Sequence, residues 1–244
     1  MNNTEARVII TQSDILFEDN HLIAVNKKPG WIVQPDKTGD DSMEESVKLF
    51  LKNKYNKPGN VFVGVTHRID RPVSGLVLFA KTSKALARLN ALFQERKMEK
   101  TYLLITRGNP AEPEGTPVHY LLRDTKNNKS AVSLNPSPGA LRCELAYRTE
   151  AQSDSFRLLR VWPHTGRHHQ IRVQMAALGC PITGDVKYGD RRANEDRSIC
   201  LHAFSLRFRH PVSDEEIALF APPPTQKFWR IFDETVRSLM KPIV

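Results

Sequence analysis

Short strand-like segments that follow one another without intervening helices constrain this fold more than any other feature of the sequence. Turn-forming stretches such as residues 127–128 and 135–139 separate these segments. Strands are predicted at residues 15–18, 22–26, 76–80, 102–105, 118–122, 130–134, 141–149, 155–162, 199–208 and 216–220. Because consecutive strands joined by turns pair antiparallel, we expect an α+β protein with a mostly antiparallel mixed sheet flanked by helices.

Apolar residues that recur at spacings of three and four predict the flanking helices. These helices are expected at residues 41–55, from Ser83 to near Met98, at residues 168–178 and from Thr225 to Met240. Ser83 is the expected N-cap of the second helix, because a hydroxyl there can accept a backbone N–H. Gly179 is expected to end the third helix.

The length and charge of the chain bound its size and its partners. Its 244 residues suffice for one large domain, and we expect a single domain over residues 1–244. Lys and Arg number 36 against 27 Asp and Glu, which gives a net charge of +9. Such a positive balance is compatible with nucleic-acid binding.

Cysteine usage and hydropathy indicate the compartment. Cys143, Cys180 and Cys200 are widely spaced and form no C-x-x-C pair, so free thiols in a reducing compartment are expected. The N-terminal residues lack the pattern of a signal peptide, and no stretch approaches 18 consecutive apolar residues. We therefore expect a cytoplasmic protein without a membrane anchor.

Several common enzyme classes lose support because their motifs are missing. The sequence contains no G-x-x-x-x-G-K-[ST], no strand-linked G-x-G-x-x-G and no H-E-x-x-H. Ser74 also lacks the G-x-S-x-G frame of a hydrolase nucleophile. Nucleotide-binding, zinc-protease and serine-hydrolase functions are therefore not favoured.

One carboxylate stands out in the stretch HRIDRPVSG, residues 67–75. Asp70 lies between Arg68 and Arg71, and neighbouring cations favour the ionised form of a carboxyl group. An ionised carboxylate can act as a nucleophile or a base. It can equally be the acid of a salt-bridged turn, and the spacing alone does not decide between these roles.

Basic residues concentrate between residues 162 and 189. On a helix, His168, Arg172 and Met175 would lie on nearby faces, with Thr165-Gly166 in the first turn. A helix N-terminus and arginine side chains both suit a phosphate. The alternative is a solvated basic helix face. A metal site built from His67, His168 and His169 is disfavoured, because adjacent histidines are poor co-ligands.

Tyr102 opens a predicted strand, and residue alternation places it on the same face as Leu104. The simplest interpretation of such a tyrosine is a core residue. The residues around it give no separate indication of chemistry.

Five segments together resemble one family. HRIDRPVSG resembles the H-R-L-D-R-x-T-S-G signature of the RluA-type RNA pseudouridine synthases. Similar blocks occur in VNKKPGWIVQP (25–35), KTYLLITRG (100–108), TGRHHQIRVQMAALGCPITGDVKYG (165–189) and LHAFSLRFRHP (201–211). They follow the family order over about residues 14–230. Pro72 is similar to the R-P-x-S-G variant of the TruC branch, which modifies tRNA, and Ile69 replaces the usual leucine.

The resemblance implies a sheet with a central RNA-binding cleft and an enzyme that isomerises uridine to pseudouridine in rRNA or tRNA. It implies no cofactor and no metal. Because the similar blocks begin near residue 14, we also expect no small RNA-binding domain before them, so RNA affinity must come from the basic surface of the catalytic domain. A monomer is the expected state.

The resemblance also assigns roles to three candidate catalytic residues. Asp70 would start the reaction at the ribose, either by attack on the anomeric carbon or as a base toward a glycal. Tyr102 would pack on the target base and remove the proton from carbon 5. Arg172 would pair with Asp70 and keep its carboxylate charged.

A second group would bind RNA and open its base stack. Arg68 would help to displace the target base, at a cost of a few kcal/mol, and Ile171 would wall the base pocket. Arg167 and His168 would contact the RNA backbone. His67 and Arg71, beside Asp70 in the motif, are assigned to the same group.

Two other classes of protein stay open. A non-catalytic RNA-binding module of the same fold is disfavoured because Asp70, Tyr102 and Arg172 are all present. A glycosidase needs a second positioned carboxyl group. Asp185 is the available candidate, and a role in a turn explains that residue better.

Overall fold

The computed structural model describes residues 8–241, which divide into two compact units. Unit 1 comprises the chain up to Glu99 together with Ala203–Pro223, and unit 2 comprises Lys100–His202 together with the chain from Pro224 onward. The chain therefore passes between the units three times, and each unit combines segments that are distant in sequence. In the stretch the structure describes, no helix is long and apolar enough to cross a membrane.

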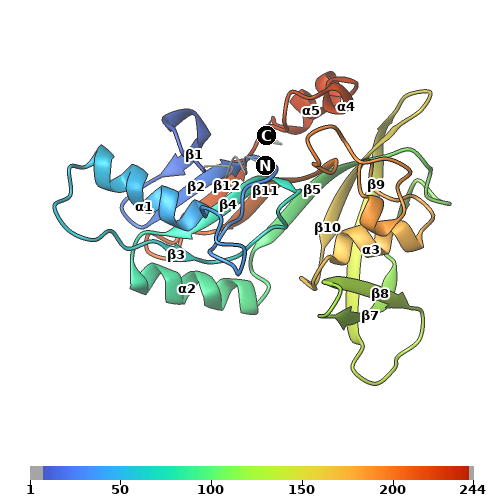
Figure 1. The fold of residues 1–244 in the computed structure, drawn as a ribbon, viewed down its shortest axis with the longest axis horizontal. Coiled ribbons are helices and arrows are strands. Elements are labelled where there is room, and N and C mark those ends of the chain that lie inside the picture. Colours follow the sequence, from blue (N-terminus) through green and yellow to red (C-terminus); the bar gives the residue numbers. More distant parts are fainter. Residues whose placement is uncertain (1–7, 242–244) are drawn as a thin grey trace. The chain divides into compact units, whose positions relative to one another are not determined.

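Unit 1 is built on a sheet in which most neighbouring strands pair antiparallel (Figure 1). Its strands are β1 (Ile15–Glu18), β2 (Leu22–Lys27), β3 (Gly64–Val65), β4 (Ser74–Ala80), β11 (Leu201–Arg209) and β12 (Glu216–Phe220). β4 pairs with both β2 and β3. All seven residues of β4 are buried, as its continuous apolar run predicts. β4 is therefore the rigid element from which the preceding HRIDRPV segment extends.

Two helices accompany this sheet. α1 (Met43–Lys54) begins at a capping box, in which the Ser42 hydroxyl accepts the N–H of Glu45 and the Glu45 carboxylate accepts from Ser42. α2 (Ser83–Gln94) buries Ala85 and Leu89 against apolar residues of β2, β4, β11 and β12. A short 3₁₀ helix, η1 (Gln12–Asp14), precedes β1.

Gly75 shows why β4 begins where it does. Its φ angle is +116°, which L side chains rarely adopt. A Cβ atom added there would lie 2.3 Å from the carbonyl oxygen of Ala203 and 2.5 Å from its nitrogen. Only glycine therefore allows the start of β4 to approach the β11 backbone so closely.

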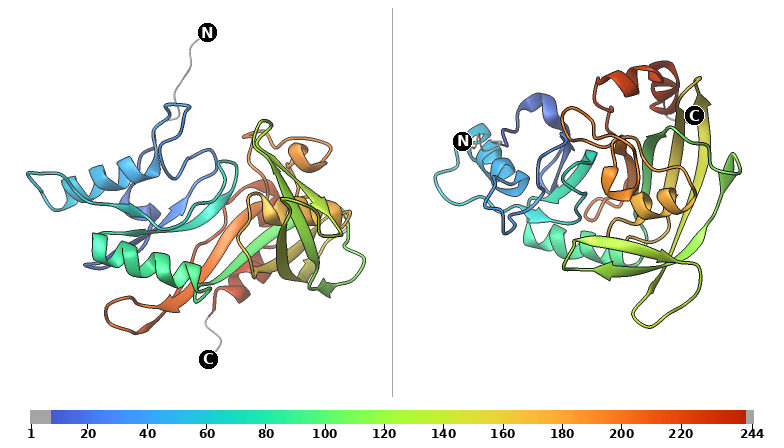
Figure 2. Two further views of the ribbon diagram at one scale, coloured as in Figure 1. Left: turned by 90° about the horizontal axis from the view of Figure 1, so that it is seen from below. Right: turned by 45° about the vertical axis from the view of Figure 1, so that its right-hand side comes forward.

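Unit 2 contains the second set of antiparallel pairings. Its strands are β5 (Glu99–Thr106), β6 (Glu114–Gly115), β7 (Val118–Asp124), β8 (Lys129–Ser133), β9 (Leu141–Gln152) and β10 (Arg157–Pro163). Its helices are α3 (Gln170–Ala177), η2 (Val186–Tyr188), α4 (Lys227–Arg230) and α5 (Asp233–Leu239). α3 lies beside the β7–β8 hairpin (Figure 2), where Val173 packs with Leu121, Cys143 and Tyr188.

The predicted strands and fold class are confirmed, whereas several helix boundaries are wrong. The N-cap of α2 is Thr82, whose hydroxyl accepts the N–H of Ala85. α2 ends at Gln94 rather than near Met98, and Arg96 just beyond has a φ of +58°. The predicted closing helix from Thr225 to Met240 is broken into α4 and α5 at Phe232, where φ is −119° and ψ is 20°.

The predicted start of the third helix is also wrong. His169 has a φ of +54° and stands as the N-cap of α3, so Thr165, Gly166 and His168 all precede the helix. His168 therefore does not share a helix face with Arg172. The alternative of a solvated basic helix is wrong as well, because every residue from Gln170 to Met175 is buried.

Candidate active site

Asp70 lies in unit 1, on the loop between β3 and β4. The N–H of Val73 donates to the Asp70 carbonyl at 3.0 Å and closes a tight turn. The Asp70 side chain is partly exposed, whereas the neighbouring Ile69 is buried. The loop thus anchors its apolar residue in the core and leaves the carboxylate within reach of a ligand.

Lys27, at the end of β2, lies beneath this loop and is 1% exposed. Its ammonium donates to the carbonyls of Val73 (2.6 Å), Arg71 (3.0 Å) and Lys28 (3.2 Å). Burial lowers the pKa of Lys27 to about 7, against the opposing attraction of the Asp70 carboxylate. One buried amine therefore ties together the backbone on the C-terminal side of Asp70 and couples electrostatically to its side chain.

His67 and Arg71 also support the loop. Nε2 of His67 accepts the N–H of Leu78 at 3.0 Å, so this nitrogen carries no proton. The bond gives the backbone N–H of Leu78 a partner at a point of β4 that lies beyond its pairing with β3. The His67 ring also packs against Phe93, with ring centroids 5.0 Å apart. Arg71 pairs with Asp40 and donates to the Thr38 hydroxyl at 3.3 Å. Arg68 and Arg71 are both exposed.

Arg172 lies in unit 2, on α3, and is 5% exposed. Its Nε and Nη2 atoms donate to the two carboxylate oxygens of Asp185 at 2.7 and 2.8 Å. Its guanidinium carbon lies 5.1 Å from the centre of the Tyr188 ring. Asp185 and Tyr188 belong to the GDVKYG segment, so the turn predicted for Asp185 also supplies a buried ion pair.

His168 and His169 connect the start of α3 to the β7–β8 hairpin. The two rings stack with centroids 3.7 Å apart. Nδ1 of His168 shares a hydrogen bond with the Ser130 hydroxyl, and Nε2 shares one with the Asn128 side chain, both at 3.0 Å. Nδ1 of His169 shares one with the Tyr188 hydroxyl at 2.7 Å.

The metal-site alternative gains no support from these contacts. Both ring nitrogens of His168 already have protein partners. Across residues 8–241, no group of three or more His, Cys, Asp or Glu side chains is arranged to hold a metal ion. The glycosidase alternative also weakens, since both Asp185 oxygens bind Arg172.

Tyr102 lies on β5 in unit 2, opposite Val161 of β10, and its side chain is partly exposed. Lys100, two residues earlier, points to the same face because side chains alternate along a strand. The Lys100 ammonium lies 3.7 Å from the position that a Cβ of Gly166 would occupy. Lys100, on the strand face that it shares with Tyr102, thus reaches the loop before α3.

Arg167 and Ile171 lie on either side of the start of α3. Arg167 is exposed, and its backbone N–H donates to the Gln170 side chain at 3.0 Å. Ile171 is 8% exposed. The structure thus leaves the Arg167 side chain open to solvent and nearly buries that of Ile171.

The sequence prediction did not include Lys27, Lys100 and Tyr188 as functional candidates, and it considered Asp185 only as a glycosidase carboxylate or a turn residue. Each lies within a segment that resembles the family: NKKPG, KTY or GDVKYG. The available signal was position within those segments. The burial and the contacts that make these residues notable depend on long-range packing and are not visible in the sequence.

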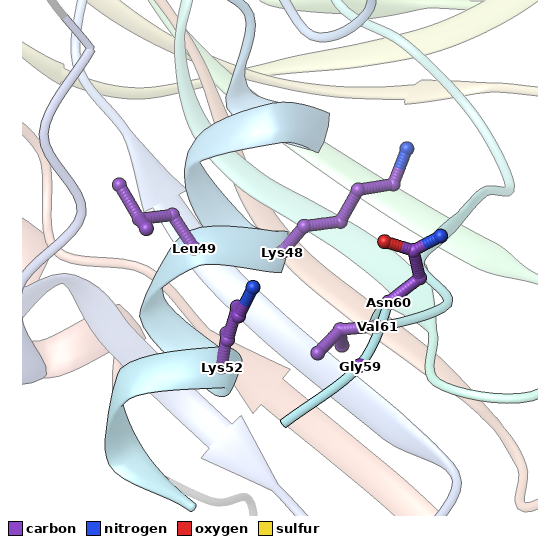
Figure 3. Close-up of a pocket in the computed structure, with 6 residues that line it drawn as sticks. All are labelled: Lys48, Leu49, Lys52, Gly59, Asn60 and Val61. Atoms are coloured by element: carbon purple, nitrogen blue, oxygen red, sulfur yellow. The ribbon is translucent and has the colours of Figure 1, made fainter. Parts of the chain in front are cut away.

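A surface groove of about 460 Å³ lies elsewhere in unit 1 (Figure 3). Lys48, Leu49 and Lys52 of α1 line it together with residues 59–61. Lys48 is paired with Glu44 one turn away. The groove is basic, but none of the candidate catalytic residues lines it, so we do not place the active site there.

Comparison with known families decides between the remaining alternatives. The profile of the family described as RNA pseudouridylate synthase matches residues 21–177. This chain belongs to that family. The expected family and enzyme class, a pseudouridine synthase, are thereby confirmed, and the match extends over parts of both units.

Individual relatives agree. The chain is 31% identical to a tRNA pseudouridine synthase C of Pectobacterium carotovorum, over 86% of this chain and 59% of that protein. It is 33% identical to a tRNA pseudouridine synthase C of Vibrio parahaemolyticus, over 85% and 89% of the two chains. It is 32% identical to a ribosomal large subunit pseudouridine synthase C of Rickettsia bellii, over 88% and 70%.

Solved structures confirm the fold. Human RNA Pseudouridylate Synthase Domain Containing 4 matches with a TM-score of 0.75 at 22% identity, over 92% of this chain and 93% of that one. Human RNA Pseudouridylate Synthase Domain Containing 1 matches with a TM-score of 0.65 at 23% identity. The predicted α+β architecture with a large, mostly antiparallel sheet is therefore the pseudouridine synthase fold.

Proposed function

We propose that this protein converts specific uridines of tRNA or rRNA to pseudouridine and that Asp70 initiates the reaction. The observation that carries the proposal is the Asp70 loop itself. In a chain of this family, Asp70 of the HRIDR motif is partly exposed, while buried Lys27 holds the backbone just after it at Arg71 and Val73. A fixed backbone lowers the cost of orienting a reactive group.

The proposed reaction is an isomerisation, so no co-reactant is consumed. The bond between uracil N1 and the ribose C1′ breaks, the base turns, and C5 of uracil joins C1′. N1 ends with a proton and C5 loses one, which balances the product with the substrate. Asp70 acts first at the ribose, as nucleophile or as base toward a glycal.

Tyr102 and Arg172 complete the proposed catalytic group. Tyr102 is assigned to the target base and to removal of the C5 proton, which its partial exposure supports. Arg172 is assigned to the Asp70 carboxylate. Its permanent positive charge suits that role, because a nearby cation favours the ionised carboxyl group.

The proposed RNA contacts separate into two groups. Arg68 and Arg167 are exposed. We assign Arg68 to the displaced base and Arg167, whose Nε donates to the Arg142 carbonyl at 3.4 Å, to the RNA backbone. Arg71 is also exposed but pairs with Asp40, and His67 and His168 bond to protein groups, so we propose that these three shape the RNA-binding surface mainly through those contacts. Ile171 is assigned to the wall of the base pocket.

Compartment and oligomeric state complete the proposal. We place the enzyme in the cytoplasm as a monomer. The three cysteines are free and buried, and burial raises the pKa of the Cys180 thiol to about 11 and of the Cys200 thiol to about 12. Protonated free thiols are consistent with a reducing compartment.

The decisive experiment combines pseudouridine mapping with one substitution. Total tRNA and rRNA from a strain that lacks this gene are compared with RNA from the parent strain. Wild-type protein is expected to restore every missing pseudouridine in vitro, and Asp70→Asn is expected to restore none while binding the same RNA. Identical maps in the two strains, or full activity of Asp70→Asn, would contradict the proposal.

A further inference from the structure

The Asp185 carboxylate holds one edge of the Arg172 guanidinium. Asp185 accepts from Nε at 2.7 Å and from Nη2 at 2.8 Å, and the two side chains are only 6% and 1% exposed. A two-point contact of this kind fixes the plane and the rotation of a guanidinium group. It engages two of the five N–H groups and leaves the others directed away from Asp185.

The face of the same guanidinium lies over Tyr188, with 5.1 Å between its carbon and the ring centre. The ring itself is immobilised, because the N–H of Ser130 donates to the Tyr188 hydroxyl at 2.8 Å and His169 shares a hydrogen bond with it at 2.7 Å. The contact of Asp185 with the edge of the guanidinium and the contact of Tyr188 with its face together define the direction in which Arg172 points.

The backbone of the turn brings these two side chains together. The N–H of Asp185 donates to Ile182, and the Asp185 carbonyl accepts the N–H groups of Tyr188 and Asp190 at 3.0 and 3.1 Å. This compact arrangement places residues 185 and 188 against the same arginine. The GDVKYG segment therefore does more than reverse the chain.

Asp185 does not strengthen the attraction between Arg172 and the Asp70 carboxylate. A carboxylate beside Arg172 cancels its positive charge and so reduces its attraction for a second carboxylate. Asp185 also offsets the cost of burying the guanidinium, but that effect concerns stability and not the reaction rate. Orientation is the remaining contribution, and a misplacement of about 1 Å can slow a reaction about 100-fold.

We infer that Asp185 and Tyr188 are positioning residues that aim Arg172 at the reacting group. This inference rests on the proposed function, in which Arg172 serves the Asp70 carboxylate. It assigns to the GDVKYG turn a role in the chemical step rather than in RNA affinity. Neither residue needs to touch the substrate.

Asp185→Asn tests the edge contact, and Asp190→Asn is its matched control. Asp190 is also a buried carboxylate of this turn, but it accepts the N–H of Gly184, at 2.6 Å. Asp185→Asn is expected to lower the single-turnover rate about 100-fold and to change RNA affinity less than twofold. Asp190→Asn is expected to keep the wild-type single-turnover rate, even if it lowers the melting temperature as much as Asp185→Asn does.

Conservative variants and a double variant distinguish a positioning role from an effect on folding. Asp185→Glu keeps a carboxylate and is expected to recover part of the rate. Tyr188→Phe keeps the ring beneath Arg172 and is expected to react faster than Tyr188→Leu. In an Arg172→Ala background, Asp185→Asn is expected to cause no further loss, because residues that act through one group are not additive. Additive losses, or a wild-type rate for Asp185→Asn, would overturn the inference.

A measurement without turnover keeps this test independent of the proposed function. The Arg172 Nε–H signal in a ¹⁵N NMR spectrum, assigned by its loss in Arg172→Lys, is expected to exchange slowly in the wild type and in Asp190→Asn. Asp185→Asn should make it exchange rapidly, and an unchanged signal would overturn the inference. Absence of uridine conversion by the wild type would instead refute the proposed function.

Discussion

At the scale of single residues, Lys27 combines two opposing requirements. Its ammonium holds the carbonyls of Lys28, Arg71 and Val73, yet its burial disfavours the charge and lowers its pKa to about 7. An unfolded lysine has a pKa of about 10.4. Between these values the unfolded chain binds more protons than the folded one, so the contribution of Lys27 to stability rises with pH.

Lys27→Met is the variant that exposes this dependence. The wild type is expected to gain stability relative to Lys27→Met between pH 7 and pH 9, by up to about 1.4 kcal/mol per pH unit. Urea unfolding of both proteins at each pH measures the difference, and all other titrating groups cancel. A difference that stays constant would show that Lys27 stays protonated in the folded protein over this range.

Lys100 is a second residue whose environment favours an external ligand. It is partly buried, burial lowers its pKa, and no carboxylate among residues 8–241 forms an ion pair with it. A buried cation without a counter-ion costs stability. Because Lys100 shares a strand face with Tyr102, we expect the anion that it lacks to be a phosphate of bound RNA.

Lys100→Met therefore has a distinctive expected signature. RNA affinity should fall roughly 10-fold, the value of one charge-assisted hydrogen bond, while the free energy of unfolding stays the same or rises. Filter binding and urea unfolding measure the two quantities. A variant that loses stability and keeps its affinity would show that Lys100 is a structural residue.

At the scale of elements, the start of β4 depends on one glycine. Gly75→Ala places a methyl group against the Ala203 backbone and keeps a φ of +116° that alanine resists. We expect a loss of about 3 kcal/mol or more in the free energy of unfolding. Gly59→Ala is the control, because nothing lies within 4 Å of its Cβ position. Equal stability of the two variants would contradict this account.

The elements also show what a sequence can predict. β4 was predictable because its apolar run is continuous, and α1 because its buried residues recur with helical spacing. The start of α3 was not, because His169 adopts φ of +54° in contact with Tyr188, a residue 19 positions away. The break at Phe232 likewise leaves no mark in the apolar periodicity.

In the candidate site too, the sequence predicted some features and missed others. Family resemblance pointed to Asp70, Tyr102 and Arg172, which occupy recognisable motifs. It did not predict that Asp185 would bind Arg172 through both oxygens, since Asp185 was expected only in a turn. Nor did it predict that His67 would give its Nε2 to the backbone of β4. Such contacts depend on tertiary packing, which spacing along the chain does not encode.

At the scale of the whole molecule, the net charge of +9 should dominate RNA affinity. The logarithm of the association constant is expected to fall linearly with the logarithm of the salt concentration, because each phosphate contact releases a counter-ion. Exposed Arg167 is assigned to one such contact, so Arg167→Gln should reduce the magnitude of the slope by about 1.

Arg237→Gln is the matched control for this measurement. Arg237 is 79% exposed at the far end of the chain and lies near Asp233 on its own helix. Removing its charge lowers the net charge as much as Arg167→Gln does, but it is expected to leave the slope unchanged. Equal changes in the two variants would show that affinity follows total charge rather than contacts at the loop before α3. A flat salt dependence of the wild type would contradict phosphate binding altogether.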